Sequence, residues 1–399
     1  MIKRIGIGLG AFAAALVAGW VMIGPDWRAL ISDPPSNTDV LFWSQSQRDT
    51  GFQMLDRVPF LVDTRPIKSS SSVYDLPQGP TLAIDDALQT YFDEGRAAAV
   101  VVLHKGKIRT ERYGLEFDAT ERWTSFSVAK SLTSTLVGAA IQDGSIASID
   151  DPVTDYIEGL RGSAYEGVSI RQVLTMTSGV GWDEDYEDPT SDVARFLAHE
   201  PSDGLPIIVS YMRGLDKAHA PGEVWNYSTG ETNLIGILVS EATGTPLADY
   251  LSQKIWGPFG MEAKATWLVG PDGVEMSGCC IQATTRDFAR FGQFILGGGR
   301  IDGAAILPDG WLDQATTKQA DIGFDPWGYG YQWWTYDGNA FGARGIFGQS
   351  IFIDPDRELV IAMNSSWSSA LGVRGGEREA REVFQRAVQS AIDAETAVN

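Results

Sequence analysis

Strand patterns occur near both ends of this chain, and a long helical stretch separates them. Residues 97–103 and 108–113 are two apolar runs joined by Lys105-Gly106-Lys107, which predicts a β-hairpin. Towards the C-terminus, strands with intervening turns are predicted at 329–334, 340–347, 350–353 and 358–364. We therefore predict an α+β fold (an α/β sandwich) in which both ends of the chain build one antiparallel sheet. Helices would flank this sheet, and a helical subdomain would be inserted between its strands.

The central part of the chain has the apolar spacing of helices. One helix is predicted from Ser125, as its N-cap, to a stop at Asp143-Gly144. Its apolar stripe consists of Phe126, Val128, Leu132, Leu136, Val137 and Ala140. Other helices are predicted at 169–176, 231–242, 246–255, 285–296 and 377–392. The Ser125 helix would lie at the seam between sheet and helical subdomain, a common place for a pocket.

Composition restricts the possible partners. The chain has 399 residues with 31 basic and 52 acidic side chains, a formal net charge of −21. Such a surface repels a phosphate backbone, so nucleic acid is excluded as a partner. The two cysteines, Cys279 and Cys280, are adjacent. Because a disulfide between neighbours needs strained geometry, they are predicted to be small buried residues rather than a redox site. No Cys/His spacing typical of a metal site is present, and no metal or cofactor is predicted.

The N-terminus predicts a membrane anchor. Lys3 and Arg4 precede an uncharged stretch at 5–23, which at 1.5 Å per residue reaches about 28 Å, enough to span a bilayer core. The basic flank would stay in the cytoplasm and the rest would be exported, with the periplasm as the expected location. A cleaved signal peptide is the alternative, although its only tidy cleavage site falls early. We divide the chain into this anchor or signal (1–25), a linker and packing segment (26–80) and one main domain (81–399).

Ser127-Val128-Ala129-Lys130 places a hydroxyl and an amine three residues apart, on one face of the predicted helix. A lysine in an apolar cleft loses its proton more readily and acts as a base toward the serine. The first turn of a helix also favours developing negative charge. The pair would make a nucleophile without histidine. The chain has three histidines, of which His104 is expected to be exposed beside the hairpin turn. An ordinary amphipathic helix with a surface Ser and Lys fits the tetrapeptide alone equally well.

Three more motifs follow in order along the chain. They are Pro221-Gly222-Glu223-Val224-Trp225-Asn226-Tyr227-Ser228, T-x-x-D-x-x-R-F-G at 284–292 and G-x-x-G-Q at 345–349. Together with the hairpin and the S-x-x-K helix, this order resembles the serine β-lactamase and penicillin-recognising superfamily over residues 81–395. Within it the chain is similar to class C-like esterases and to the 6-aminohexanoate-dimer (nylon oligomer) hydrolases. The resemblance implies a beta-lactamase/transpeptidase-like fold.

The resemblance also implies roles for individual residues. Ser127 would be the nucleophile and Lys130 its base. Tyr227, 100 residues after Ser127, would carry a proton to the leaving group. A neighbouring ammonium favours a phenolate, so Tyr227 can act as acid or base. The backbone N–H groups of Ser127 and Gln349 would form the oxyanion hole.

The G-x-x-G-Q motif departs from the lactamase pattern. Ile346-Phe347-Gly348 takes the place of their K-T-G, and Ile346 and Gly348 are predicted to contact substrate, Gly348 because a missing side chain allows close backbone approach. No cation stands where lactamases hold the drug carboxylate, since Arg344 lies farther along the strand. Tyr227-Ser228-Thr229 likewise replaces the lactamase Y-x-N. We therefore expect a neutral ester or amide substrate rather than efficient β-lactamase activity.

Two sets of residues leave their roles open. The loop at 181–189 resembles the one that covers the active site in nylon-oligomer hydrolases, which implies that Tyr186 contacts the substrate amide. The acidic residues of this loop are interpreted as solvated. Aromatic residues could line a pocket or belong to the core; they are Trp182, Trp225, Trp327, Trp333 and Trp334.

These observations predict a serine hydrolase that cleaves a small-molecule ester or amide through an acyl-enzyme on Ser127. Two alternatives remain. The first is a penicillin-binding-like sensor that binds cell-wall peptide without turnover, and the second is a D,D-peptidase or true β-lactamase. The sequence does not predict an oligomeric state.

Overall fold

The computed structural model describes residues 18–20, 22–35, 40–58 and 62–398. The predicted anchor at 5–23 falls mostly outside these ranges. Among the helices described, none combines the length and the apolar character needed to cross a membrane.

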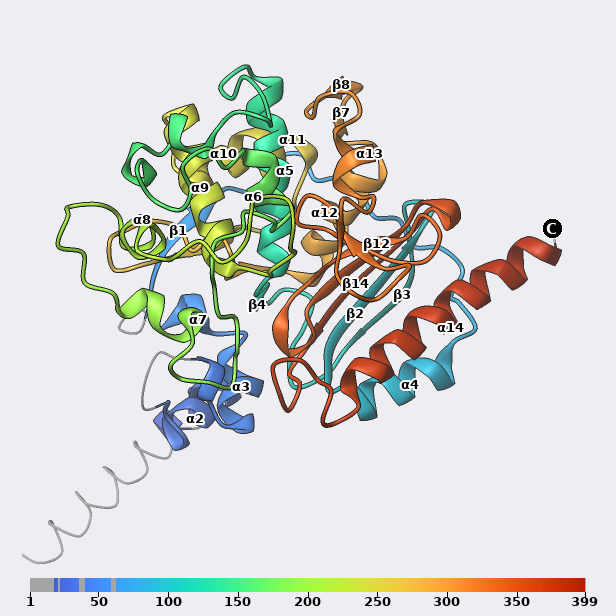
Figure 1. The fold of residues 1–399 in the computed structure, drawn as a ribbon. Helices are drawn as coiled ribbons and strands as arrows, with labels where there is room; N and C mark the ends of the chain where they lie inside the picture. Colours follow the sequence, from blue (N-terminus) through green and yellow to red (C-terminus); the bar gives the residue numbers. More distant parts are fainter. Residues whose placement is uncertain (1–17, 21, 36–39, 59–61, 399) are drawn as a thin grey trace, which may run out of the picture.

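An eight-stranded antiparallel sheet is the centre of the fold (Figure 1). Its strand order is β3-β2-β14-β13-β12-β11-β10-β9, so the N-terminal hairpin pairs directly with the last strand of the chain. The strands are β2 (Ala97–His104), β3 (Lys107–Tyr113), β9 (Ala320–Asp321), β10 (Gly328–Tyr329), β11 (Trp334–Thr335), β12 (Phe341–Arg344), β13 (Ser350–Asp354) and β14 (Leu359–Ser365). In register, Ile361 of β14 lies opposite Val102 of β2. The prediction of one sheet built from both ends of the chain is confirmed.

Two predicted strands are wrong in detail. The pattern at 329–334 suggested one strand, but Tyr329 pairs with Trp334 across a tight reversal. The reversal is possible because Gln332 adopts a φ of +59°, which the alternating sequence does not reveal. The predicted strand 340–347 ends at Arg344, because Phe347 also has a positive φ, +57°, and residues 346–348 form a turn.

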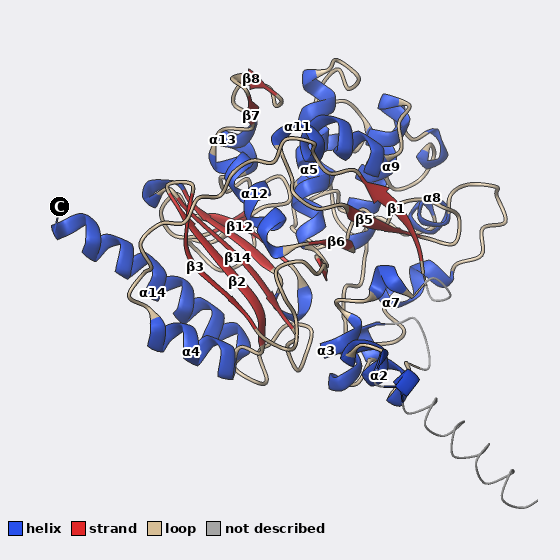
Figure 2. Cartoon of the chain, turned by 180° about the vertical axis from the view of Figure 1, so that it is seen from behind, coloured by secondary structure: helices blue, strands red, loops and turns tan. Residues whose placement is uncertain are grey.

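Helices cover both faces of the sheet. On one face α4 (Asp85–Glu94) and α14 (Glu377–Val398) lie side by side, as Figures 1 and 2 both show. On the other face, α12 (Thr285–Leu296) packs against β14 and β2. The side chains of β2 alternate between the two layers, with Val100 and Val102 in one core cluster and Val101 and Leu103 in the other. Burial on both faces explains why β2 is apolar throughout.

The helical subdomain lies between β4 (Trp123–Thr124) and α12. It begins with α5 (Val128–Gln142), whose predicted stop at Asp143 is confirmed. The other helices are α6 (Ile170–Leu174), α7 (Asp192–Arg195), α8 (Ile207–Arg213), α9 (Thr229–Thr243), α10 (Leu247–Leu251), the π-helical turn Ser252–Trp256, and α11 (Gly257–Phe259). After α12 come the small hairpin β7 (Arg300–Ile301) and β8 (Ala304–Ala305), and α13 (Trp311–Ala315). Because α5 packs against both α9 and β12, it connects the subdomain with the sheet.

The segment before residue 80 packs onto the main body. It contains α2 (Pro25–Ser32), α3 (Gln45–Gly51) and β1 (Asp63–Ile67). Strand β1 belongs to a second sheet of order β1-β5-β6-β4, with β5 at Ala265–Val269 and β6 at Ile281–Ala283. This second sheet was not predicted. It matters for function because β4 leads directly to Ser127.

His104 is not exposed, as its position beside the hairpin turn had suggested. Only 8 % of its surface is accessible. A guanidinium nitrogen of Arg109 lies 2.8 Å from the Nδ1 of His104, and Arg109 also forms an ion pair with Glu395. The C-terminal helix therefore covers this end of the hairpin, a contact that distant sequence positions create.

Candidate active site

Ser127 lies at the start of α5, where the chain turns out of β4. Ser127 itself is the N-cap, and the predicted N-cap, Ser125, serves another purpose. The Ser125 hydroxyl accepts a hydrogen bond from the backbone N–H of Ile281 at 2.9 Å and donates one to the carbonyl of Phe126. Phe126 has a φ of +41°, so the turn that presents Ser127 is held in a sparsely populated conformation by its contact with β6.

Lys130 lies one turn further along the same helix face, as predicted. Its Nζ donates to the Ser127 Oγ at 3.0 Å, to the Thr229 Oγ1 at 2.8 Å and to the carbonyl oxygen of Gly278 at 2.8 Å. The side chain is almost completely buried. Burial lowers the pKa of Lys130 to about 8, although the negative charge of Glu184 opposes the change. A neutral amine beside the serine is therefore accessible near neutral pH.

Tyr227 joins this pair from the segment before α9. The Lys130 Nζ lies 5.1 Å from the centre of the Tyr227 ring. Burial, followed by the charge of Glu184, raises the pKa of Tyr227, while a hydrogen bond with Ser127 acts in the opposite direction. The expectation that the ammonium would favour the phenolate is therefore wrong for the resting site: desolvation dominates, and Tyr227 is a neutral phenol that can donate a proton.

Glu184 is a member of the site that the sequence analysis missed. It was grouped with the solvated acidic residues of its loop, yet its carboxylate accepts hydrogen bonds from the Thr229 hydroxyl, from the Thr229 backbone N–H at 2.8 Å and from the Tyr186 hydroxyl at 2.7 Å. Its neighbours Asp183 and Asp185 are exposed, as expected. The chain Glu184–Thr229–Lys130–Ser127 is thus continuous, and it orients the amine toward the serine. Nothing in the W-x-E-x-Y spacing of the sequence distinguishes Glu184, as a member of the site, from the exposed carboxylates on either side of it.

Tyr186 lies on the same loop and lines the space next to Ser127. Its hydroxyl donates to Glu184, and burial raises its pKa well above the ordinary value. Tyr186 is therefore a neutral donor group whose position depends on Glu184. Contact with the substrate amide stays a prediction.

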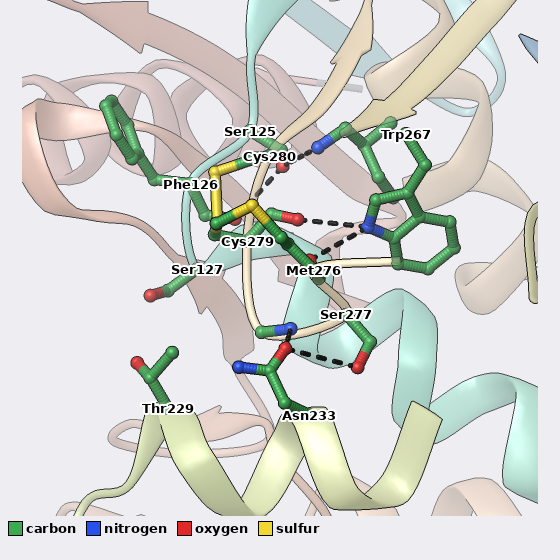
Figure 3. The surroundings of a disulfide bond; sticks show 12 residues. Ser125, Phe126, Ser127, Thr229, Asn233, Trp267, Met276, Ser277, Cys279 and Cys280 are labelled. Carbon is green, nitrogen blue, oxygen red and sulfur yellow. Dashed lines mark hydrogen bonds between the residues drawn. A yellow bond between two sulfur atoms is a disulfide. The ribbon is translucent and has the colours of Figure 1, made fainter. Parts of the chain in front are cut away.

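The segment 276–280 lies beside Ser127 (Figure 3), and the carbonyl oxygen of its Gly278 accepts the hydrogen bond from Lys130. Cys279 and Cys280 are joined by a disulfide, so the prediction of two unlinked cysteines is wrong. Adjacent cysteines were not expected to form a disulfide because of the strained backbone that it needs. Cys280 adopts a left-handed φ of +74°, a conformation that the sequence does not show. Asn233 of α9 accepts a hydrogen bond from the Gly278 N–H at 2.9 Å, so α9 fixes the carbonyl that binds Lys130.

Gln349 follows the turn 346–348 at the edge of β13. Its side chain amide donates to the carbonyls of Ile346 and Ser365, both at 3.1 Å, and its Oε1 accepts from the Ser365 N–H. Within the described ranges, the backbone N–H groups of Gln349 and Ser127 have no intramolecular acceptor. Both are therefore free to donate to a substrate oxygen, as the predicted oxyanion hole requires.

Gly348 has a structural reason for lacking a side chain. Its φ is +101°, and a Cβ would lie 2.5 Å from the Trp367 Nε1 and 2.6 Å from the Ser365 Cβ. These contacts are within the protein. Ile346 lines both spaces next to Ser127, whereas a substrate contact of Gly348 stays a prediction.

Two cavities meet at Ser127. The first, which we call the arginine pocket, has a volume of about 650 Å³ and is lined by Tyr227, four tryptophans and three arginines. The tryptophans are Trp225, Trp327, Trp334 and Trp367; of the remaining candidates that the sequence suggested, Trp182 and Trp333 belong to the core. The second cavity, which we call the apolar chamber, has a volume of about 670 Å³. Ser127, Tyr186 and Ile346 line both.

The arginine pocket corrects the expectation that this end of the site lacks a cation. Position 346 is indeed an isoleucine, but α14 brings Arg378 and Arg381 to the same cavity, and Arg344 lines it too. Arg344 and Arg378 both approach Glu382, at 3.5 and 3.4 Å. Arg381 is 2 % exposed; its guanidinium carbon lies 4.8 Å from the centre of the Trp367 ring, and among the described residues it forms no ion pair, although the charge of Glu382 also acts on it. Burial and the charge of Arg344 lower the pKa of Arg381 to about 10, so it stays charged at neutral pH.

The arrangement can therefore support nucleophilic chemistry at a carbonyl. A serine is hydrogen-bonded to a buried amine of lowered pKa, a neutral phenol lies beside them, and two backbone N–H groups are unpaired. In the part of the chain that the structure describes, no group of three or more His, Cys, Asp or Glu residues is arranged to hold a metal ion.

Comparison with known proteins gives the family. The Beta-lactamase family model matches residues 84–383. The chain is 32 % identical over 300 residues to the 6-aminohexanoate-dimer hydrolase of Paenarthrobacter ureafaciens, covering 70 % of this chain and 75 % of that protein. It is 28 % identical over 182 residues to a beta-lactamase of Pseudomonas fluorescens, covering 44 % of this chain and 46 % of that protein.

Solved structures show the same fold. A Bacillus anthracis protein named for 6-aminohexanoate-dimer hydrolase activity superimposes with a TM-score of 0.74 at 23 % identity, covering 87 % of this chain and 94 % of that one. A family VIII carboxylesterase gives a TM-score of 0.60 at 17 % identity and covers 78 % of this chain and 99 % of that one. The fold is thus beta-lactamase/transpeptidase-like, and the chain belongs to the beta-lactamase family of serine hydrolases.

Proposed function

We propose that this protein cleaves a small amide or ester through an acyl-enzyme on Ser127. The observation that carries the proposal is the buried Lys130 amine, 3.0 Å from the Ser127 Oγ and with a pKa lowered to about 8. A binding module without turnover has no need of a serine, a base and a proton donor in one place. The 32 % identity to a 6-aminohexanoate-dimer hydrolase supports an amide or ester bond as the target.

Acylation follows from the geometry. The Ser127 Oγ attacks the carbonyl carbon while the neutral Lys130 amine takes its proton, and the N–H groups of Ser127 and Gln349 donate to the oxygen that becomes negative. When the bond to the leaving group breaks, Tyr227 donates its phenol proton to the departing nitrogen or oxygen. The Lys130 ammonium, now over the ring, stabilises the phenolate.

Deacylation reverses these proton transfers. The Tyr227 phenolate takes a proton from water, the water oxygen attacks the acyl carbon, and Ser127 leaves with the proton that Lys130 had held. The net reaction adds one water across the bond and returns all three side chains to their starting forms.

The direct test is to detect the acyl-enzyme. The full-length protein is mixed with p-nitrophenyl butyrate, quenched in acid and analysed by mass spectrometry, and the turnover of the ester is followed in parallel. We expect a butyryl mass increase on the peptide that contains Ser127, together with steady release of p-nitrophenol. If the wild-type protein turns over the ester and yet shows no adduct on this peptide, even after rapid quenching, the mechanism is contradicted. An adduct that never turns over would favour the sensor hypothesis.

The pH dependence of acylation should follow Lys130. Only the neutral amine accepts a proton, and the pKa of Lys130 is lowered to about 8. As pH rises toward 8, the fraction of neutral amine rises, so kcat/KM should increase about tenfold per pH unit below 8 and level off above it. The measurement is kcat/KM for p-nitrophenyl butyrate from pH 5.5 to 9.5, corrected for spontaneous hydrolysis. A profile that falls over this range, or that is flat from pH 6, would exclude Lys130 as the base.

The arginine pocket supports a substrate whose leaving group carries a carboxylate. Tyr227, the proposed proton donor to the leaving group, lines this pocket and not the apolar chamber. The leaving group would therefore lie among the arginines, where Arg381 is buried and forms no ion pair with any described carboxylate. A carboxylate there would form a desolvated, charge-assisted contact. The leaving group of a 6-aminohexanoate dimer, 6-aminohexanoate, has this chemistry.

Replacing Arg381 tests this assignment. We expect Arg381→Met to raise KM for N-butyryl-6-aminohexanoate by about 10- to 100-fold, because a hydrogen bond to a charged group is lost. The matched control is Arg386→Met, an exposed arginine one turn further along the same helix. The comparison substrate is N-butyryl-6-aminohexanamide, which lacks the charge. An equal rise in KM for both substrates would show that Arg381 acts on the fold and not on the carboxylate.

A further inference from the structure

The apolar chamber is the second cavity that Ser127 lines, and most of its lining residues differ from those of the arginine pocket. The inference drawn from it rests on the proposed function, because it concerns which acyl group reaches the Ser127 carbonyl. Most of its lining residues are aliphatic or aromatic, and among the residues that the structure describes the one charged lining residue is Asp63, whose side chain is exposed. Its volume, about 670 Å³, falls within the range of sites that enclose small ligands.

The assignment of the two cavities follows from the position of the proton donor. A scissile amide or ester has two sides, and the phenol of Tyr227 must face the leaving-group side. Tyr227 lines the arginine pocket only, whereas Ser127 lines both cavities. With the leaving group in the arginine pocket, the acyl group extends into the apolar chamber.

The chamber is built partly from chain outside the family match, which begins at residue 84. Trp43, Met54, Leu55 and Val58 form part of its wall, and each is at least 95 % buried. The lining also includes the linked Cys279 and Cys280, which lie close to Ser127 in Figure 3, and Cys280 belongs to the same hydrophobic cluster as Trp43 and Leu55. The N-terminal segment thus encloses an apolar space beside the nucleophile.

This lining separates alkyl from amine-terminated acyl groups. An aliphatic chain gains free energy each time a methylene group is removed from water. An acyl group with a terminal ammonium, as in a 6-aminohexanoyl group, would place its charge among mostly apolar side chains, where none of the described lining residues is a buried carboxylate that could pair it. The chamber therefore favours an acyl group with an alkyl chain and disfavours one that ends in an ammonium.

We propose that the substrate is an amide or ester that joins a medium-length alkanoyl group to a small carboxylate-bearing amine or alcohol. The alkanoyl chain occupies the apolar chamber, and the carboxylate lies against Arg381. Hydrolysis adds water across the carbonyl–heteroatom bond, releasing a fatty acid and an amino or hydroxy acid, with no oxidant or cofactor required. The N-acyl amino acids belong to this chemical class.

Three amides with one leaving group test the proposal. They are N-acetyl-6-aminohexanoate, N-octanoyl-6-aminohexanoate and the linear 6-aminohexanoate dimer. Octanoyl adds six methylenes to acetyl, so we expect kcat/KM for the octanoyl amide to exceed that for the acetyl amide by at least about 100-fold. The dimer should be a poorer substrate than the octanoyl amide. Equal rates for acetyl and octanoyl, or a preference for the dimer, would overturn the assignment of the chamber.

A variant localises the effect. Val193 of α7 lines the chamber, so Val193→Trp should lower the octanoyl-to-acetyl ratio of kcat/KM by at least about tenfold. Val383→Trp, at an exposed position of α14 that lines neither cavity, should leave the ratio unchanged. An unchanged ratio in the folded Val193→Trp variant would contradict the proposal.

The outcomes for the two proposals are distinguishable. If p-nitrophenyl esters never acylate Ser127, the proposed function fails and the acyl-chain inference fails with it. If Ser127 is acylated equally fast by p-nitrophenyl acetate and octanoate, the hydrolase mechanism stands and only the acyl-chain inference is overturned.

Discussion

Lys130→Ala should lower kcat/KM for p-nitrophenyl butyrate by about 10⁴-fold, close to the effect of Ser127→Ala, since a general base of this kind contributes up to that factor. The amine is the basic group hydrogen-bonded to the Ser127 hydroxyl, and its two other hydrogen bonds, to Thr229 and Gly278, fix its direction. None of the three histidines of the chain lines either cavity at Ser127, so no imidazole replaces the lost base. The double variant Ser127→Ala/Lys130→Ala should be no slower than either single variant, because the two residues act as a unit.

Lys130→Arg separates the base from a merely structural cation. A guanidinium retains the charge and can donate to Thr229 and Gly278, but it does not lose its proton in proteins. We therefore expect this variant to remain folded and to be as inactive as Lys130→Ala. Thermal unfolding followed by circular dichroism controls for the fold. Substantial activity in Lys130→Arg would contradict the assignment of Lys130 as the base.

Tyr227→Phe should have an effect that depends on the leaving group. For an amide, whose nitrogen must be protonated to leave, we expect kcat/KM to fall by about 10³-fold. For p-nitrophenyl butyrate, whose leaving group departs as a stable anion, acylation should fall far less. Tyr227 can protonate the amide nitrogen because burial raises its pKa and keeps it a neutral donor in the resting enzyme.

The measurement is single-turnover acylation with N-butyryl-6-aminohexanoate and with p-nitrophenyl butyrate. Trp334→Phe is a suitable control. Trp334 stacks on Tyr227 with ring centres 5.7 Å apart, but it has no hydroxyl that could protonate the leaving group. Equal losses for amide and activated ester in Tyr227→Phe would show that the tyrosine shapes the pocket without transferring a proton.

Much of the fold could be predicted from the sequence because its signals are local. The hairpin at 97–113 and the helix at 285–296 follow from apolar period and turn residues, and the structure confirms both. The errors occur where backbone conformation depends on tertiary contacts. A positive φ that the residue type does not predict occurs at Gln332, Phe347 and Cys280. The first two lie where a predicted strand was wrong, and the third lies in the cysteine pair whose disulfide was not predicted.

The candidate site divides in the same way. Ser127 and Lys130 could be paired from their spacing, since residues three apart on a helix share a face. Glu184 could not be distinguished from Asp183 and Asp185 until the fold placed it under Thr229.

The sequence by itself determined the hairpin, the principal helices, the use of both chain ends in the main sheet and the Ser-Lys pair, because these depend on neighbours along the chain. Only the tertiary structure decided which residues line the cavities next to Ser127 and Lys130. Arg381 from the last helix and Trp43 from the N-terminal segment line the two cavities that meet at Ser127, although both lie far from it in sequence. Burial is the physical reason: it removes water from Lys130 and Tyr227 and so moves their pKa values in opposite directions, and burial is a property of packing that no local motif contains.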